Sequence, residues 1–361
     1  MIDKPRDVIV LGSLSVLSAW GFDLLRFLFS ISDAPFTVYN VDRNGPIPTP
    51  AVEGTRTAVI SHFPTKNLLD RAAMPTSRVI VFLDDPVDSV RYVQDASDCT
   101  VLDAIRLQAA AVAGYVSIRG LPSLCILHRY LKTPRQVLQF VLNHFELTIE
   151  EDTVETLAAQ FWGPEGVTGS LESALKNYVP LYAPLNSLTN LLTPEDNSLV
   201  AETLTPMLRM MFANADETLV WSRRVFQSGD SLHGVAPLSI DLTGGARVLY
   251  YGPCFHIPAG HWSARMLVGF NKGAVKMPFS AEVNSDEKLA HIIMVPEEKG
   301  VFLASFDFEN HNALHPIEIR IKVDRGAISG HIAFSRVELW LGELPPPSSG
   351  ISSFLKRKES T

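Results

Sequence analysis

A turn of small residues follows the first apolar run of the chain and is a candidate anion-binding site. Residues 7–11 read DVIVL, and residues 12–18 then read GSLSVLS before a segment with helical spacing of apolar residues. In such strand–turn–helix units the turn amides and the helix N-terminus point toward an anion. The turn has one glycine, no lysine or arginine and no GxxxxGK[ST] pattern, which argues against ATP or GTP hydrolysis by a P-loop. We expect either a weak phosphate site or a structural turn.

Candidate metal ligands are few. Asp84, Asp85 and Asp88 follow the apolar run VIVFL and could hold a divalent ion, or they could cap the next helix, whose N-terminus favours negative charge. Capping is the preferred interpretation. The three cysteines lie far apart and form no CxxC pair, so neither a structural zinc site nor a disulfide framework is expected. We therefore predict no bound metal.

Alternating strands and helices are predicted for the first 215 residues. Apolar runs typical of strands buried on both faces occur at residues 7–11, 36–41, 57–60, 79–83 and 124–127. The segments between them have the spacing of helices. Strands that alternate with helices imply right-handed crossovers and a mostly parallel sheet. We predict an α/β three-layer domain over residues 1–215.

Short β-type runs separated by glycine and proline begin near Asp216. Residues 317–323 (IEIRIKV) alternate apolar and charged side chains, as a half-buried antiparallel strand does. Several such strands at short intervals predict an all-β sandwich, jelly-roll-like, over residues 216–345. The Pro- and Ser-rich residues 346–361 are expected to form a flexible tail.

Composition limits the partners and the compartment. Of 361 residues, 46% are hydrophobic and 19% charged, which favours a packed core. The net charge of −8 argues against nucleic acid as the main partner. No uninterrupted apolar run reaches the ~20 residues that a membrane helix requires, and acidic residues interrupt the basic N-terminal stretch that a signal peptide needs. With its unpaired cysteines, the chain is expected to be cytoplasmic, and its oligomeric state is left open.

Four motifs of the first domain, taken in order, resemble the sulfotransferase family. Residues 56–64 (RTAVISHFP) end a strand in Ser-His-Phe-Pro, and residues 79–92 (VIVFLDDPVDSVRY) place Asp-Pro at a strand end with a serine downstream. Residues 124–147 (LCILHRYLKTPRQVLQFVLNHFEL) and 192–208 (LTPEDNSLVAETLTPML) are similar to two later segments of the family. The resemblance covers residues 7–212 and implies a P-loop-like fold that binds a nucleotide sulfate.

The resemblance also implies roles for individual residues. Family members transfer a sulfuryl group from 3′-phosphoadenosine 5′-phosphosulfate to a hydroxyl or amine. His62 matches the general base, a role that suits imidazole because it titrates near neutral pH; the alternative is a hydrogen-bonded turn residue. The implied donor-binding residues are Gly12, Ser13, Ser15 and Ser18 of the turn for the 5′-phosphosulfate, and Ser89 for the 3′-phosphate.

Two positions depart from the family pattern. Its 5′ loop carries a lysine or arginine and a glycine–threonine pair, where this chain has residues 14–17 (LSVL). Asp84 replaces an arginine, and two unit charges ~5 Å apart in an effective dielectric of ~20 repel each other by about 3 kcal/mol. The missing arginine also removes an attraction to phosphate. Use of the sulfate donor therefore depends on a cation from elsewhere, such as Lys66, Arg78 or Arg91.

An aromatic stretch of the second domain is a candidate sugar-binding site. Residues 250–262 (YYGPCFHIPAGHW) resemble the opening of β-sandwich modules that are joined to bacterial enzymes of surface-polysaccharide assembly. Aromatic residues near a strand edge of such modules can stack on sugar rings. The implied contacts are Tyr251, Phe255 and Trp262 for stacking, with His256 or Arg265 for polar contacts. The alternative is that these side chains form the core of the sandwich.

Two functions are consistent with these observations. The first is a sulfotransferase-like protein of bacterial surface-polysaccharide biosynthesis that transfers a sulfuryl group to a glycan hydroxyl, with His62 as base. The second is a non-catalytic scaffold that binds a glycan or a glycan-assembly protein and whose nucleotide site has decayed. Both require that the turn at residues 12–18 and the corner at residues 61–64 share one cleft. A cation beside the turn would favour the enzyme, and an acidic or apolar cleft the scaffold.

Overall fold

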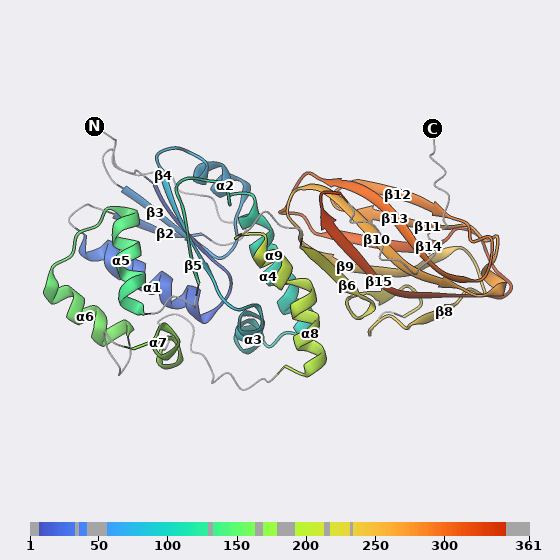
Figure 1. The fold of residues 1–361 in the computed structure, drawn as a ribbon, viewed down its shortest axis with the longest axis horizontal. Coiled ribbons are helices and arrows are strands. Elements are labelled where there is room, and N and C mark those ends of the chain that lie inside the picture. The colour runs from blue at the N-terminus through green and yellow to red at the C-terminus, as the bar shows by residue number, and fades with distance from the viewer. Residues whose placement is uncertain are drawn as a thin grey trace. The chain divides into compact units, whose positions relative to one another are not determined.

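The chain forms two compact units, Met1–Val200 and Ala201–Thr361 (Figure 1). The computed structural model describes residues 7–32, 36–41, 56–128, 133–162, 169–178, 192–212, 217–231 and 234–343. The division at Val200 falls earlier than the predicted boundary at residue 215. The tail predicted for residues 346–361 lies outside the described residues.

A five-stranded parallel sheet forms the centre of the first unit. Its strands are β1 (Asp7–Gly12), β2 (Phe36–Asn40), β3 (Arg56–Ser61), β4 (Ser77–Leu83) and β5 (Leu124–His128). They lie in the order β2-β3-β1-β4-β5, and every neighbouring pair is parallel. Side chains 8–11 of β1 are fully buried, because helices cover both faces of the sheet. The predicted α/β class is confirmed.

The strand order reverses direction at β1. The chain runs from β1 toward β2 and β3 on one side and then crosses to β4 and β5 on the other. Helix α1 (Val16–Ile31) therefore covers one face, and α2 (Lys66–Ala72), α3 (Pro86–Ser97) and α4 (Val101–Val116) cover the other (Figure 1). Ligands of open α/β sheets bind outside the carboxyl ends of the strands at such a reversal.

Later helices complete the layer of α1. Helices α5 (Pro134–Phe145), α6 (Glu151–Phe161) and α7 (Leu171–Asn177) follow β5, and α8 (Pro194–Thr203) and α9 (Thr205–Arg209) lead toward the second unit in sequence. The rings of Phe29 in α1 and Phe145 in α5 are 5.8 Å apart. The Trp20 indole donates a 2.8 Å hydrogen bond to the carbonyl of Phe161. These contacts join α1 to α5 and α6.

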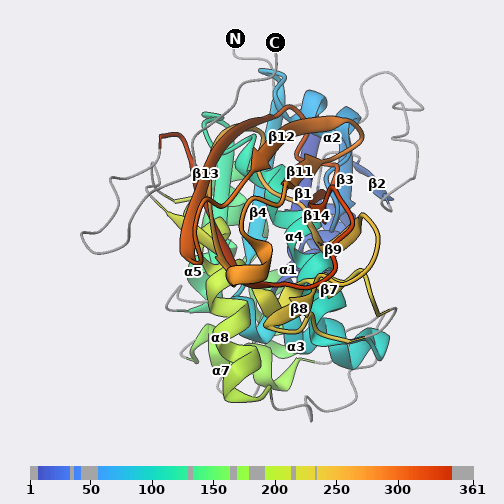
Figure 2. The ribbon, with the colours of Figure 1, turned by 90° about the vertical axis from the view of Figure 1, so that its right-hand side faces the viewer.

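Two antiparallel sheets form the second unit, as predicted. One contains β13 (Gly300–Asn310), β10 (Gly260–Phe270), β15 (His331–Leu341) and β6 (Thr218–Ser222) in that order, with β8 (Ser239–Asp241) paired to β15. The other runs β12 (Lys288–Met294), β11 (Phe279–Asn284), β14 (Ile317–Val323), β9 (Arg247–Phe255) and β7 (Gln227–Ser228), an order visible in Figure 2.

Aromatic side chains join the two sheets. The Phe270 and Phe279 rings are 4.8 Å apart, and those of Tyr250 and Phe334 are 5.1 Å apart, each pair linking one strand of either sheet. Ile317, Ile319, Ile321 and Val323 of β14 are buried, whereas the charged residues between them face outward. The second unit is a β-sandwich with its core between the sheets.

No single helix in the described part of the chain combines the length and apolar character of a membrane span. Helices α3 and α4 reach those limits only when taken together, and the chain bends by 114° between them.

Candidate functional site

The two corners singled out in the sequence lie in direct contact. Nδ1 of His62 is 3.0 Å from the carbonyl oxygen of Gly12. Because β1 and β3 are parallel neighbours, with Leu11 opposite Ser61, the residues that follow them meet at one edge of the sheet. A carbonyl only accepts, so we assign the ring proton to Nδ1, which leaves Nε2 as the acceptor.

The surroundings of His62 hold it in place and keep it neutral. Its ring lies 4.7 Å from that of Phe22, and the hydroxyl of Tyr115 in α4 donates a 2.6 Å hydrogen bond to its backbone carbonyl. Burial lowers the pKa of His62, an effect that outweighs the opposing hydrogen bond to Gly12. A neutral imidazole with a fixed tautomer can accept a proton from a hydroxyl group.

The lowered pKa predicts that acid destabilises the fold. The unfolded chain binds a proton at His62 as the pH falls through 6.5, whereas the folded chain takes it up only at lower pH. Burial lowers the pKa of His144 as well, so both residues make the folded state less stable as the pH falls.

We expect His62→Asn, which keeps a donor for Gly12, to reduce the loss of unfolding free energy between pH 7 and 5. The reduction is at most about 1.4 kcal/mol per pH unit. Urea denaturation at both pH values measures it, and parallel curves for wild type and variant would contradict it.

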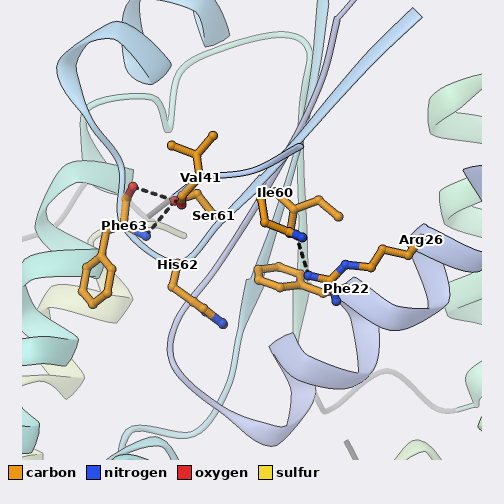
Figure 3. Close-up of a pocket in the computed structure, with 8 residues that line it drawn as sticks. Phe22, Arg26, Val41, Ile60, Ser61, His62 and Phe63 are labelled. Atoms are coloured by element: carbon orange, nitrogen blue, oxygen red, sulfur yellow. Dashed lines mark hydrogen bonds between the residues drawn. The ribbon is translucent and has the colours of Figure 1, made fainter. Parts of the chain in front are cut away.

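A pocket of about 190 Å³ opens beside His62 (Figure 3). Its walls come from α1, from the end of β2 and from the corner after β3. The hydroxyl of Ser61 shapes the corner, because it donates to the Val41 carbonyl at 2.7 Å and accepts from the Phe63 amide at 3.1 Å. The lining side chains are Phe22, Arg26, Asn40, Val41, Ile60, Ser61, His62 and Phe63.

The turn between β1 and α1 is packed tightly and bonded to itself. Ser15 caps α1, since its hydroxyl accepts from the Ser18 amide at 3.1 Å. The Ser18 hydroxyl in turn donates to the Phe82 carbonyl of β4. A Cβ atom on Gly12 would lie 2.4 Å from the Ser18 hydroxyl, so only glycine fits there. The Ser13 amide also donates to Phe82, at 3.1 Å.

Asp84 occupies the N-terminal end of α1. One of its carboxylate oxygens accepts from the Leu17 amide at 3.4 Å, and the other accepts from the Asp85 amide at 2.9 Å. The residue is 4% exposed. The sequence predicted that Asp84 would repel a phosphate bound near the turn; the structure places its carboxylate against an amide that such an anion would use.

Two buried hydroxyl groups lie near the same turn. Ser89, in the first turn of α3, and Ser13 are both buried, and neither hydroxyl has a hydrogen-bond partner among the described residues. The amide of Gln108 in α4 donates to the carbonyls of Leu14 and Ser89, at 2.6 and 3.0 Å. Gln108 therefore joins the turn to the start of α3.

The cations considered as substitutes are paired elsewhere. Lys66 lies 2.7 Å from Asp70, and Arg91 lies 3.5 Å from Asp88 on its own helix. Arg78 is at the start of β4, at the opposite end of the sheet, and pairs with Glu146. None of the three is bonded to the turn at residues 12–18.

The residues present do not fit a phosphosulfate group. Asp84 already accepts from Leu17, and the Ser13 and Ser18 amides have intramolecular acceptors. The unpartnered hydroxyls of Ser13 and Ser89 leave room for polar contacts, but they carry no positive charge to offset a phosphate. The Asp84 carboxylate therefore competes with an anion for the Leu17 amide, one of the donors that the predicted 5′-phosphosulfate site would use.

Metal ligands do not gather in the described part of the chain. No group of three His, Cys, Asp or Glu side chains there is arranged to hold an ion. Asp85 instead caps α3, because its carboxylate accepts from the amides of Val87 and Asp88.

Three of the five residues predicted to contact sugar are buried in the sandwich. Phe255, His256 and Trp262 are each at most 4% exposed. The Trp262 indole donates to the Pro258 carbonyl at 2.9 Å, and Nδ1 of His256 lies 3.1 Å from the Ala313 carbonyl. Side chains without accessible surface cannot stack on a sugar ring, so in this structure the alternative core interpretation holds for all three.

Tyr251 differs from these three residues. It is half-buried on β9, next to the fully buried Tyr250, because successive side chains of a strand point to opposite faces. On the outer face it lies opposite Arg320 of β14 and Gln227 of β7. Of the three predicted stacking residues, Tyr251 keeps an accessible ring. Arg265, the fifth predicted residue, is half-buried on β10, with its guanidinium 5.1 Å from the centre of the Trp340 ring.

Arg26, Asn40, Gln108 and Tyr115 were missed by sequence reasoning. Arg26 lies four residues after Phe22, on the same side of α1, which is a signal that could have been noticed. Its hydrogen bond to Asn40 depends on β2 lying beside β3, which the local sequence does not reveal. Gln108 and Tyr115 act from a helix on the other face of the sheet.

No protein-family model and no curated protein matches the chain. A mouse sulfotransferase, SULT7A1, solved with PAP, is similar over 59% of this chain and 86% of its own, at 12% identity and a TM-score of 0.38. A retinol dehydratase solved with androsterone and PAP is similar over 59% and 82%, at 11% identity and a TM-score of 0.36. The CBM36-1 domain of a xylanase from the hindgut metagenome of Trinervitermes trinervoides is similar over 36% and 100%, at 9% identity and a TM-score of 0.26. Each likeness concerns the fold alone.

Proposed function

We propose that the chain is a sulfotransferase-like, glycan-directed protein that binds its ligand in the pocket beside His62 and transfers no sulfuryl group. The observation that carries this proposal is the position of Asp84, whose buried carboxylate accepts from the Leu17 amide at the N-terminus of α1. An acidic group at the turn, where the enzyme requires a cation, agrees with the expectation for the scaffold.

The energetics support the same conclusion. A donor phosphate placed ~5 Å from Asp84 would be repelled by about 3 kcal/mol per unit charge at an effective dielectric of ~20. Displacing the carboxylate would leave the Asp85 amide without its acceptor, at a cost of about 1–3 kcal/mol, even where the phosphate replaces Asp84 at the Leu17 amide. Arg78, Arg91 and Lys66 offset neither effect, because each pairs with a carboxylate elsewhere.

Sulfuryl transfer is the second candidate function, and the geometry of His62 favours it. The Gly12 carbonyl fixes the ring tautomer, and burial keeps the ring neutral, as a general base requires. Under this candidate, His62 would accept the proton of a glycan hydroxyl held in the pocket, and Asp84 would have to leave the helix N-terminus.

Titration with 3′-phosphoadenosine 5′-phosphate (PAP) separates the two functions. Isothermal titration calorimetry of the whole chain is expected to give no binding heat up to millimolar ligand. Micromolar binding of PAP would overturn the proposal and restore sulfuryl transfer.

The biological setting is part of the proposal. A role in bacterial surface-polysaccharide biosynthesis, with a glycan or a glycan-assembly protein as partner, is supported by the likeness of residues 250–262 to modules of such enzymes. A cytoplasmic location is supported by Cys99, Cys125 and Cys254, which form no disulfide with one another.

A further inference from the structure

Arg26 places a guanidinium group at the pocket beside His62, with its charge partly offset by the Asp23 carboxylate 2.6 Å away. Among the described residues that line the pocket, Arg26 is the one charged side chain; the others are apolar, aromatic, or the polar Asn40, Ser61 and His62. A guanidinium is ionised at any physiological pH and presents a planar set of donors that matches a carboxylate. This lining should therefore bind ligands that carry a carboxylate more tightly than neutral ligands.

Hydrogen bonds to Asp23 and Asn40 help to hold the guanidinium in position. Nη1 donates to Asp23 at 2.6 Å, and Nη2 donates to the Asn40 side chain at 2.7 Å. Asp23 is 3% exposed, does not line the pocket, and also accepts from the hydroxyl of Tyr178. Because these bonds come from α1, β2 and the segment after α7, little conformational entropy remains for Arg26 to lose when a ligand binds.

The rest of the lining suits a sugar ring. Nε2 of His62, left as an acceptor, can take a hydrogen bond from a hydroxyl group. The Phe22 and Phe63 rings and the aliphatic side chains of Val41 and Ile60 provide apolar surface for the C–H face of a pyranose. A cation, a hydroxyl acceptor and an apolar wall thus converge within about 190 Å³.

We infer that the pocket beside His62 binds an acidic sugar, a pyranose ring that bears a carboxylate, with Arg26 as the residue that selects the carboxylate. This inference rests on the proposed glycan-directed function and names the class of its ligand. The carboxylate pairs with the guanidinium, and a ring hydroxyl donates to His62.

Calorimetric titration with methyl glucuronide and methyl glucoside tests the inference. These probes differ in one carboxylate, and hydrogen bonds to charged groups contribute enough that the glucoside should bind about 10- to 100-fold more weakly. Arg26→Gln should remove this difference. Arg26→Lys, which keeps the charge but loses the two-point geometry, should bind the glucuronide more weakly than wild type and still prefer it to the glucoside.

Arg71→Gln is the matched control. Arg71 also pairs with a partly buried aspartate, Asp7, but at the opposite end of the sheet, so this variant should keep the wild-type preference. If Arg26→Gln fails to fold, the affinities of wild type and Arg26→Lys for the two probes still test the inference. Equal affinity for both probes, or no binding of the glucuronide, would overturn the inference. Neither result would bear on PAP, whose titration tests the proposed function separately.

Discussion

Asp84→Asn is expected to strengthen binding of PAP about 100-fold over wild type. The substitution removes a negative charge from the N-terminus of α1, where one unit of repulsion at ~5 Å corresponds to about 3 kcal/mol. The asparagine oxygen can still accept from the Leu17 amide, so α1 keeps its partner, whereas the Asp85 amide loses its acceptor. Calorimetric titration of both proteins with PAP measures the change.

Asp88→Asn is the control for this result. Asp88 lies on the next helix and pairs with Arg91, and its loss should leave PAP affinity within a few-fold of wild type. Equal affinities for Asp84→Asn and Asp88→Asn would show that Asp84 is not what keeps the donor out.

Trp262→Ala is expected to lower the free energy of unfolding by about 3–5 kcal/mol, the range for removal of a buried aromatic side chain. Trp262 has no exposed surface and donates a hydrogen bond to Pro258, so the substitution opens a cavity and removes one of the two hydrogen bonds to that carbonyl, the other coming from Asn310. Urea denaturation gives the change, and hydrogen exchange at β10 assigns it to the sandwich.

Tyr251→Ala provides the comparison on the same unit. Its ring is half-buried on the outer face, and its removal should cost about 1 kcal/mol, the centre of the range for single substitutions. A Trp262→Ala protein with wild-type stability and weakened sugar binding would argue against the core position and restore the stacking role.

The sequence was sufficient to bring the two corners together. Buried apolar runs identified β1 and β3, and parallel strands necessarily end at one edge of their sheet. The 3.0 Å contact itself also requires β3 to lie next to β1 and the His62 ring to turn toward the Gly12 carbonyl, and the local sequence reveals neither. The fold class of both units was also predictable, because strands that alternate with helices form a parallel sheet, and short alternating strands at short intervals form an antiparallel sandwich.

The position of Asp84 could not be predicted. Its charge and its place after β4 were evident, and both indicated repulsion of a phosphate. Whether its carboxylate points toward solvent or onto the Leu17 amide depends on the dihedral angles of one short loop. This difference changes the interpretation from electrostatic repulsion alone to direct competition for the Leu17 amide.

The aromatic stretch at residues 250–262 was ambiguous for a different reason. Tyr250 and Tyr251 are identical in type, so composition does not reveal which of them faces the core. Registry against β14 decides it: Tyr250 lies opposite the buried Ile321, and Tyr251 lies opposite the exposed Arg320. Such registry depends on partners distant in the chain.

Helix α4 supports both corners from the far side of the sheet. Gln108 bonds to the turn before α1, and Tyr115, two helical turns later, bonds to the His62 carbonyl. One helix thus fixes the distance between the two loops. The pocket beside His62 is therefore preformed and does not depend on a ligand for its shape. Substitutions that shift α4 along its axis should accordingly change the affinity for a ligand without contacting that ligand.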